Sequence, residues 1–237
     1  MSVQPSARHT PVDIRLYADA AAAGSALASR VAADLRSAIA LRGAARLAVS
    51  GGTTPAPFLR ALASEDVEWN RVHVTLTDER WVPPGHPRAN ATLVADCLLK
   101  DRAAACHWHP LYLPDVGFTA GVARLNADLA DFGWPLDVAV LGIGADGHVA
   151  SLFPGARSWQ GVDLAQPLVP AVSPTGEERV SLTLATLRSS RQRYLLFSGE
   201  SKLALVESLA TADPELPAAA LIADARDPLV AYASRGP

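Results

Sequence analysis

An aspartate and a histidine stand two residues apart in a glycine-rich break that directly follows an apolar run. The run is Leu136 to Leu141, and the break contains Asp146 and His148 among three glycines. The run is short enough to be a buried strand, and open α/β sheets bind ligands at the carboxyl ends of their strands. Glycine lets the backbone approach a ligand, and histidine exchanges a proton near neutral pH. The stretch therefore predicts a site for acid–base chemistry, with a tight turn carrying a surface histidine as the competing interpretation.

A second turn of small residues follows another predicted strand, residues 46–49. Its sequence is SGGTTP, residues 50–55, and we expect Thr54 to cap a helix whose first residue is Pro55. Exposed N–H groups and the helix dipole favour an anion at such a turn, although an ordinary capped turn is the alternative. The candidate phosphate-binding residues are Gly51, Gly52 and Thr53. The turn matches neither a Walker loop nor a dinucleotide fingerprint.

Three consecutive charged residues follow a third predicted strand, residues 72–76. They are Asp78, Glu79 and Arg80, and two prolines close the stretch at 83–84. We expect residues 77–84 to form a rigid polar loop at the end of the strand. Such a loop is either solvated and internally ion-paired, or part of a functional site.

Two more cations are expected at strand or helix beginnings. Arg179 opens an alternating run, residues 179–184, that is typical of a strand. Lys202 lies in the first turn of the helix expected after a strand at residues 194–198. Because the helix dipole disfavours a cation in the first turn, we expect Lys202 to serve an anion.

The alternation of strands and helices predicts one α/β domain with a largely parallel open sheet flanked by helices. A long helix is expected after Asp19, with an apolar residue every fourth position and an end at Gly43. The other expected segments are a flexible N-terminal stretch at 1–12, the α/β domain over 13–237, an irregular stretch at 156–178 that could form a mobile flap, and final short strands at 219–223 and 229–233.

Composition excludes several classes of function. The chain has 237 residues and a net charge of −3. It therefore lacks the excess of positive charge that favours binding to nucleic acid or to an anionic membrane. No apolar run approaches the roughly 20 residues of a membrane span, and the first residues lack the apolar core of a signal peptide. Two cysteines indicate no disulfide framework, so we expect a cytoplasmic protein. The stretch Cys106 to His109 lacks a second ligand cluster, so neither a metal nor another cofactor is expected.

Five motifs in this order resemble those of the 6-phosphogluconolactonases, in the larger group that includes glucosamine-6-phosphate deaminases and ribose-5-phosphate isomerases. They are SGGTTP (50–55), TDERWVP (77–83), LGIGADGHVASLFPG (141–155), RVSLTL (179–184) and SGESK (198–202). The resemblance spans nearly the whole chain and implies a modified Rossmann-like fold of the sugar-phosphate isomerase/deaminase type. Arg80 and the SLFPG run resemble the lactonases, whereas the deaminases have DEY and an FNEP-like run at these places.

Three short stretches depart from the pattern of this family. The chain has Ala89-Asn90-Ala91 where Ser-Asn-Tyr is usual, Glu177-Glu178 where prolines are usual, and Arg188-Ser189-Ser190 where an asparagine is common. Asn90 is expected to cap a helix. These departures concern contacts to the substrate and leave the implied reaction unchanged.

The resemblance implies hydrolysis of a sugar-phosphate lactone, 6-phospho-D-glucono-1,5-lactone, to 6-phospho-D-gluconate in the oxidative pentose phosphate pathway. No cofactor is implied, and the expected state is a monomer or a weak homodimer. On this basis His148 is the general base that activates water. Arg80 or the amides of the glycine loops stabilise the oxyanion, and Asp146 either orients His148 or shapes the turn.

The same resemblance assigns the substrate-binding residues. The phosphate is expected at the turn of residues 51–53, neutralised by Arg179 and Lys202, and Asp78 is expected to contact the substrate. Two rival functions stay open, an amino-sugar-phosphate deaminase or isomerase and a non-catalytic sugar-phosphate sensor. A sensor would have no reason to retain His148, which argues weakly against it. A dinucleotide-dependent oxidoreductase is disfavoured because its fingerprint is absent.

Overall fold

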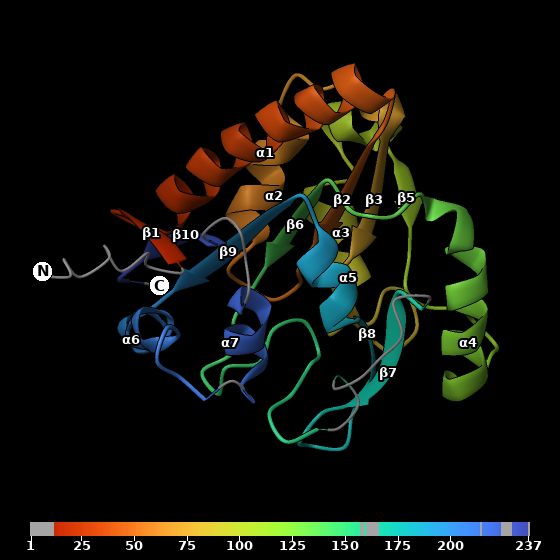
Figure 1. Ribbon diagram of the computed structural model, residues 1–237. Helices are drawn as coiled ribbons and strands as arrows, with labels where there is room; N and C mark the ends of the chain where they lie inside the picture. Colours follow the sequence, from red (N-terminus) through yellow and green to blue (C-terminus); the bar gives the residue numbers. More distant parts are fainter. Residues whose placement is uncertain (1–11, 157–158, 160–165, 214, 224–228, 237) are drawn as a thin grey trace, which may run out of the picture.

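The structure, a computed structural model, describes residues 12–156, 159, 166–213, 215–223 and 229–236. Within these residues, seven parallel strands form a large sheet and three antiparallel strands form a small one (Figure 1). The strands of the large sheet, in spatial order, are β1 (Val12–Tyr17), β10 (Leu229–Ser234), β9 (Gln192–Ser198), β6 (Val138–Leu141), β2 (Ala45–Val49), β3 (Val72–Leu76) and β5 (His107–His109). The strands of the small sheet are β4 (Asp78–Arg80), β8 (Glu178–Leu182) and β7 (Leu168–Val172).

Helices connect and cover these strands. In Figure 1, α5 and α7 pack against each other and lie apart from α1 and α2. The α-helices are α1 (Ala20–Arg42), α2 (Ala56–Ala63), α3 (Asn90–Cys97), α4 (Phe118–Asp128), α5 (Leu184–Ser189), α6 (Glu200–Ser208) and α7 (Pro217–Ile222). The short 3₁₀-helices are η1 (Trp69–Arg71), η2 (Asp101–Ala105) and η3 (Ala130–Phe132). The prediction of an α/β fold with a largely parallel sheet flanked by helices is confirmed.

The long helix α1 forms as the sequence predicts. The Asp19 side chain accepts a hydrogen bond from the N–H of Ala22 at 2.8 Å, and Gly43 ends the helix with φ +80°. The apolar stripe of α1 is buried against the large sheet. A Cβ added at Gly24 would lie 2.8 Å from the backbone nitrogen of Phe58. The backbones of α1 and α2 therefore approach closely where α1 has no side chain.

The strand order gathers the predicted loops at one edge of the large sheet. Strands β9, β6, β2 and β3 are consecutive neighbours and run parallel. Their carboxyl ends consequently lie side by side. The residues that follow these four strands include the two glycine-rich turns, the charged run after β3 and the beginning of α6.

The charged run after β3 is a strand, and the predicted loop at residues 77–84 is in this part wrong. Only Thr77 separates β3 from β4, and β4 pairs with β8 in the small sheet. The sequence pattern does not indicate this strand, because consecutive charges lack the alternation of a half-buried strand. Both Asp78 and Glu79 are nevertheless buried.

Two further predictions about elements are wrong. Residues 217–222 form the helix α7, not a strand at 219–223, because Pro217 begins a helix well and its alanines favour helix over strand. The stretch at 156–178, predicted to be irregular, contains β7. A strand was predicted at residues 179–184, but local sequence patterns do not reveal that it pairs with β7. The rest of the predicted flap lies partly outside the described residues. So does the predicted flexible segment, except Val12, which already belongs to β1.

No helix in the described ranges has both the length and the apolar character needed to cross a membrane.

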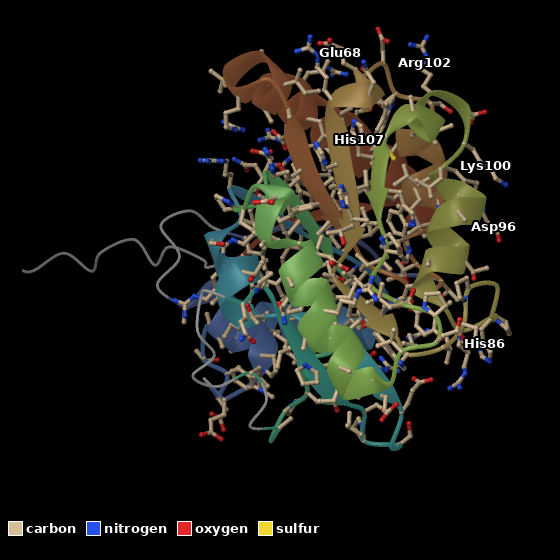
Figure 2. The ribbon with its side chains drawn as sticks, turned by 90° about the vertical axis from the view of Figure 1, so that its right-hand side faces the viewer. Glu68, His86, Asp96, Lys100, Arg102 and His107 are labelled. Carbon is tan, nitrogen blue, oxygen red and sulfur yellow. The ribbon has the colours of Figure 1, made fainter. Side chains whose placement is uncertain are left out.

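Three histidine rings, among them that of His107 (Figure 2), stack at the β3–β5 edge of the large sheet. His73 Nδ1 lies 3.0 Å from His109 Nε2, and the His73 ring stacks on His107 with centroids 4.8 Å apart. Phe132 meets both His73 and His109 edge-on. Burial, and then the charges of His109, His107 and Arg46, lower the pKa of His73. Burial, and then His107, lower the pKa of His109. The folded protein therefore favours the neutral rings of His73 and His109.

We expect the free energy of unfolding to decrease as the pH is lowered through 6.5, the ordinary pKa of histidine. Below this pH the unfolded chain binds protons that the folded cluster resists, so acid favours unfolding. Urea denaturation between about pH 7.5 and 5 measures the slope. His73→Gln should make it shallower. His86→Gln, in the loop after β4, is the control, and an unchanged slope in the His73 variant would contradict the assignment.

Candidate active site

A pocket of about 230 Å³ opens where the carboxyl ends of the central strands meet the small sheet. Its lining includes every site residue predicted from the sequence except Asp146, which contacts His148 from outside the lining. The predicted residues in the lining are Gly51, Gly52, Thr53, Asp78, Arg80, His148, Arg179 and Lys202. Five chain segments that are far apart in the sequence thus converge on one cavity.

Two glycines shape the turn after β2. Gly52 has φ +95°, a conformation that residues with side chains rarely adopt. A Cβ at Gly51 would lie 1.8 Å from Asn90 Oδ1, so only glycine fits beside Asn90. The predicted Thr54 cap is wrong: Pro55 is the N-cap residue of α2 and no side chain caps this helix. Pro55 already has helical angles, φ −77° and ψ −8°, so the chain enters the helix through a turn.

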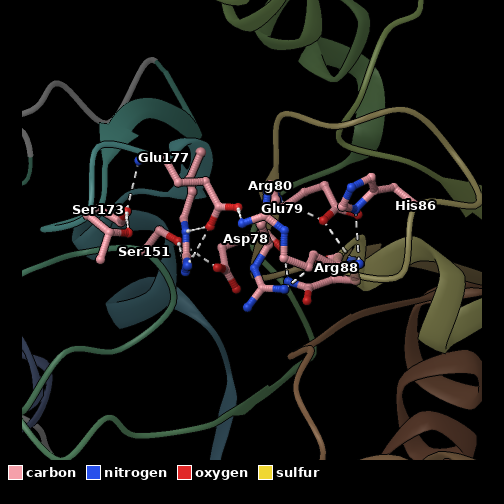
Figure 3. A network of polar contacts seen from close by, with 11 residues as sticks. Asp78, Glu79, Arg80, His86, Arg88, Ser151, Ser173 and Glu177 are labelled. Carbon is pink, nitrogen blue, oxygen red and sulfur yellow. Dashed lines mark hydrogen bonds and ion pairs between the residues drawn. The ribbon is translucent and has the colours of Figure 1, made fainter.

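The small sheet contributes an aspartate and two arginines to the pocket. Asp78 is buried, and its Oδ2 accepts a hydrogen bond from Ser151 Oγ at 2.6 Å. Arg80 on β4 and Arg179 on β8 are directly opposite in the antiparallel register. Figure 3 shows the polar network that links β4 with Ser151 and with Glu177. On this side of the pocket, charged side chains form the wall, and hydrogen bonds and ion pairs hold them in place.

Glu79 organises the beginning of α3. Its buried carboxylate accepts the backbone N–H groups of Arg80, Asn90 and Ala91, each at 2.7 Å. Burial raises the pKa of Glu79 above its ordinary value, although these N–H donors oppose the shift. The predicted cap by Asn90 is wrong, since Asn90 is already the first residue of α3. Its side-chain amide instead donates to the carbonyl of Asp78 at 2.8 Å.

The histidine and aspartate of the glycine-rich turn contact each other directly. His148 Nδ1 lies 2.6 Å from Asp146 Oδ1, and the backbone N–H of His148 donates to the same oxygen at 3.2 Å. Burial alone would raise the pKa of Asp146, but the N–H, the charge and the ring of His148 together lower it. Asp146 thus contacts both the ring and the backbone of the turn, and its role in the reaction stays a prediction.

The other nitrogen of the ring stays open. Nε2 of His148 has no hydrogen-bond partner within the described part of the chain, and 31% of the side chain is exposed. The centroids of the Phe153 and His148 rings lie 5.1 Å apart. The Arg179 guanidinium carbon lies over the Phe153 ring, 5.6 Å from its centroid. Phe153 therefore contacts both the imidazole and a pocket arginine.

Lys202 lies in the first turn of α6, as the sequence predicts, and faces the same pocket. It forms no ion pair with any described residue. An unpaired cation at the positive end of a helix is stabilised when an anion binds there. Lys202 thus supplies positive charge from the side of the large sheet.

The sequence missed several residues of the lining. Ile143, Ala150 and Leu196 form its apolar part, and no pattern distinguishes them from ordinary core residues. Ala150 has φ +51°, which is uncommon outside glycine. Asn90 was visible only as an expected cap. Ser151, which supports Asp78 from outside the lining, was visible only as part of a motif, because this contact joins residues far apart in the chain.

No group of three or more His, Cys, Asp or Glu side chains in the described ranges is arranged to hold a metal ion. The residues Cys106 to His109 lie at and just before β5, away from the pocket lining.

The fold and the pocket together define an open α/β protein with a polar, cation-rich pocket at the carboxyl edge of its sheet. Residues 18–230 match the model of the family described as glucosamine-6-phosphate isomerases/6-phosphogluconolactonase. The chain belongs to this family.

Relatives and solved structures support the same assignment. The 6-phosphogluconolactonase of Rhizobium meliloti is 40% identical over 93% of this chain and 97% of the relative. The 6-phosphogluconolactonase of Pseudomonas aeruginosa is 38% identical over 86% of this chain and 87% of the relative. The crystal structure of a 6-phosphogluconolactonase from Shewanella baltica has a TM-score of 0.85 and 30% identity, covering 95% of this chain and 98% of that one.

Gly144→Ala should displace the histidine–aspartate pair, because a Cβ there would lie 2.1 Å from His148 Nδ1 and 2.5 Å from Asp146 Oδ1. We expect kcat for lactone hydrolysis to fall on the order of 10²-fold, since small displacements of a reacting group cost this much. Gly142→Ala is the matched variant, because its Cβ would meet only Ser50 Oγ at 3.9 Å. Equal losses in the two variants would contradict this account.

Proposed function

We propose that the protein hydrolyses 6-phospho-D-glucono-1,5-lactone to 6-phospho-D-gluconate, the second step of the oxidative pentose phosphate pathway. One observation carries the proposal: an oriented imidazole and the cations Arg179 and Lys202 line the same pocket. A lactone hydrolase for a phosphorylated sugar needs both, a base beside the ester carbon and positive charge at the distant phosphate. The relatives named 6-phosphogluconolactonases add support from sequence.

The proposed base is Nε2 of His148. The lowered pKa of Asp146 keeps this carboxylate ionised near neutral pH. A carboxylate only accepts hydrogen bonds, so Nδ1 carries the ring proton toward Asp146 and Nε2 has its lone pair available. That nitrogen accepts a proton from water while the water oxygen bonds to the lactone carbonyl carbon. The resulting tetrahedral intermediate breaks its bond to the ring oxygen, which takes the proton back from the imidazolium.

Negative charge grows on the carbonyl oxygen during this step. The proposed partners are N–H groups of the glycine-rich turns or the guanidinium of Arg80, which lines the pocket. Donors that are fixed before the substrate binds need no reorganisation during the reaction. Arg80 is held in this way, because its Nη1 donates to the carbonyl of Arg88.

The phosphate is proposed to bind between the turn of residues 51–53 and the side chains of Arg179 and Lys202. The turn offers N–H groups shortly before α2 begins, and the two cations neutralise a dianion. A firmly held phosphate also fixes the ring for attack by water. Asp78 is proposed to accept a sugar hydroxyl, because a carboxylate repels phosphate. We keep the expectation of a monomer or weak homodimer in the cytoplasm as a prediction.

His148→Ala should lower kcat by on the order of 10²–10⁴, with a smaller change in KM, because the variant lacks the general base. The rate is measured against a blank without enzyme, since the lactone also hydrolyses on its own. A near-normal kcat in the variant would remove His148 from the role. Release of ammonia from glucosamine 6-phosphate by the wild type would instead favour the deaminase, and binding without turnover would favour the sensor.

Arg179→Ala and Lys202→Ala should mainly raise KM for the phosphorylated lactone, because each removes a cation from the proposed phosphate site. The comparison substrate is unphosphorylated glucono-1,5-lactone, for which the KM of the variants should match that of the wild type. If the wild type hydrolysed both lactones with equal kcat/KM, the assignment of the phosphate site would be wrong.

A further inference from the structure

We infer that Glu177 is a positioning residue: its carboxylate is the shared counter-ion that holds the pocket arginines and thereby sets the affinity for the substrate phosphate. This inference rests on the proposed lactonase function. Glu177 itself is not part of the pocket lining.

The starting point is an electrostatic conflict in the small sheet. Arg80 and Arg179 are directly opposite on adjacent antiparallel strands, and like charges in such cross-strand pairs destabilise a sheet. Both side chains nevertheless line the pocket. Only 16% of the Arg179 side chain is exposed, so solvent screens this repulsion poorly. An anion from the protein must therefore compensate the pair before any ligand arrives.

Glu177 supplies this anion to Arg179 directly and is linked to Arg80 through Arg88. Its Oε2 accepts hydrogen bonds from Arg179 Nη2 at 2.8 Å and Nε at 3.1 Å. Its Oε1 forms an ion pair with Arg88 Nη1. The carbonyl of the same Arg88 accepts a hydrogen bond from Arg80 Nη1. One carboxylate thus connects directly to the first pocket arginine and, through one residue, to the second (Figure 3).

The backbone holds Glu177 rigidly. It ends the turn between β7 and β8, where its N–H donates to Ser173 Oγ at 3.0 Å and its carbonyl accepts the N–H of Ser173 at 2.9 Å. Gly176, with φ +83°, lets the chain close this turn. Only 15% of the Glu177 side chain is exposed. The counter-ion is therefore fixed as firmly as the strands beside it.

This geometry leaves only one long contact, to Ser151, on the third nitrogen of the Arg179 guanidinium. Nε and Nη2 face Glu177, whereas Nη1 lies 3.5 Å from Ser151 Oγ, whose hydroxyl is bonded to Asp78. Removing the carboxylate would add net positive charge to the pocket but would release the guanidinium. Lost orientation acts at contact distance, and we expect it to outweigh the added charge, because the phosphate must meet a guanidinium held in a fixed direction.

Glu177→Gln tests the inference, because it keeps the shape and removes the charge. We expect KM for 6-phosphogluconolactone to rise about three- to tenfold with kcat within about twofold, as a charge-assisted contact is weakened. KM for unphosphorylated glucono-1,5-lactone should not change. Glu178→Gln is the matched control, since it makes the same charge change at the next, exposed residue, and both constants should match the wild type.

Arg88→Gln and the double variant provide the second measurement. Arg88→Gln keeps the backbone carbonyl and should raise KM less than Glu177→Gln, and the double variant should match Glu177→Gln alone because the residues act through one contact. An unchanged or lower KM in the Glu177 variant would overturn the inference, as would equal loss of kcat with both lactones. If Glu177→Gln does not fold, KM of Arg88→Gln decides. A wild type no faster than the blank would defeat the proposed function itself.

Discussion

The two sheets join at one buried residue, and the pocket depends on this joint. The N–H of Thr77 donates to the carbonyl of Val49 in the large sheet at 2.9 Å. Its carbonyl accepts the N–H of Leu182 in the small sheet at 2.8 Å. Because β4 follows at once, Asp78 and Arg80 are placed at the carboxyl edge of the large sheet. The joint therefore brings the charges of one sheet to the glycine-rich turns of the other.

Buried charge is the second constraint on this region. Asp78 and Glu79 are adjacent and both buried, an arrangement that is costly unless every oxygen has donors. Ser151 supplies a donor to the first, and three backbone N–H groups supply donors to the second. These contacts tie α3 to β4 and make the wall rigid. Two consecutive buried charges are unfavourable in a strand, and proteins usually accept such local conflicts only at functional sites.

Much of the fold and most of the site were predictable from the sequence. The central strands are short apolar runs, and glycine-rich turns after such runs point to the carboxyl edge of a sheet. Of the small sheet only the strand β8 was predictable, because β4 is too short and too charged to have a pattern and the pairing of β7 with β8 is not visible in local patterns. Similarly, the roles of Glu79, Asn90 and Glu177 depend on contacts between residues that local patterns do not relate.

The positions of the two pocket cations have a mechanical consequence. Arg179 belongs to β8 of the small sheet, whereas Lys202 belongs to α6, which extends from β9 of the large sheet. A multivalent anion that touches both would act as a removable crosslink between layers whose backbones already meet at Thr77. While the anion is bound, the two sheets would unfold more nearly as one cooperative unit. After the anion leaves, the sheets would move more independently of each other.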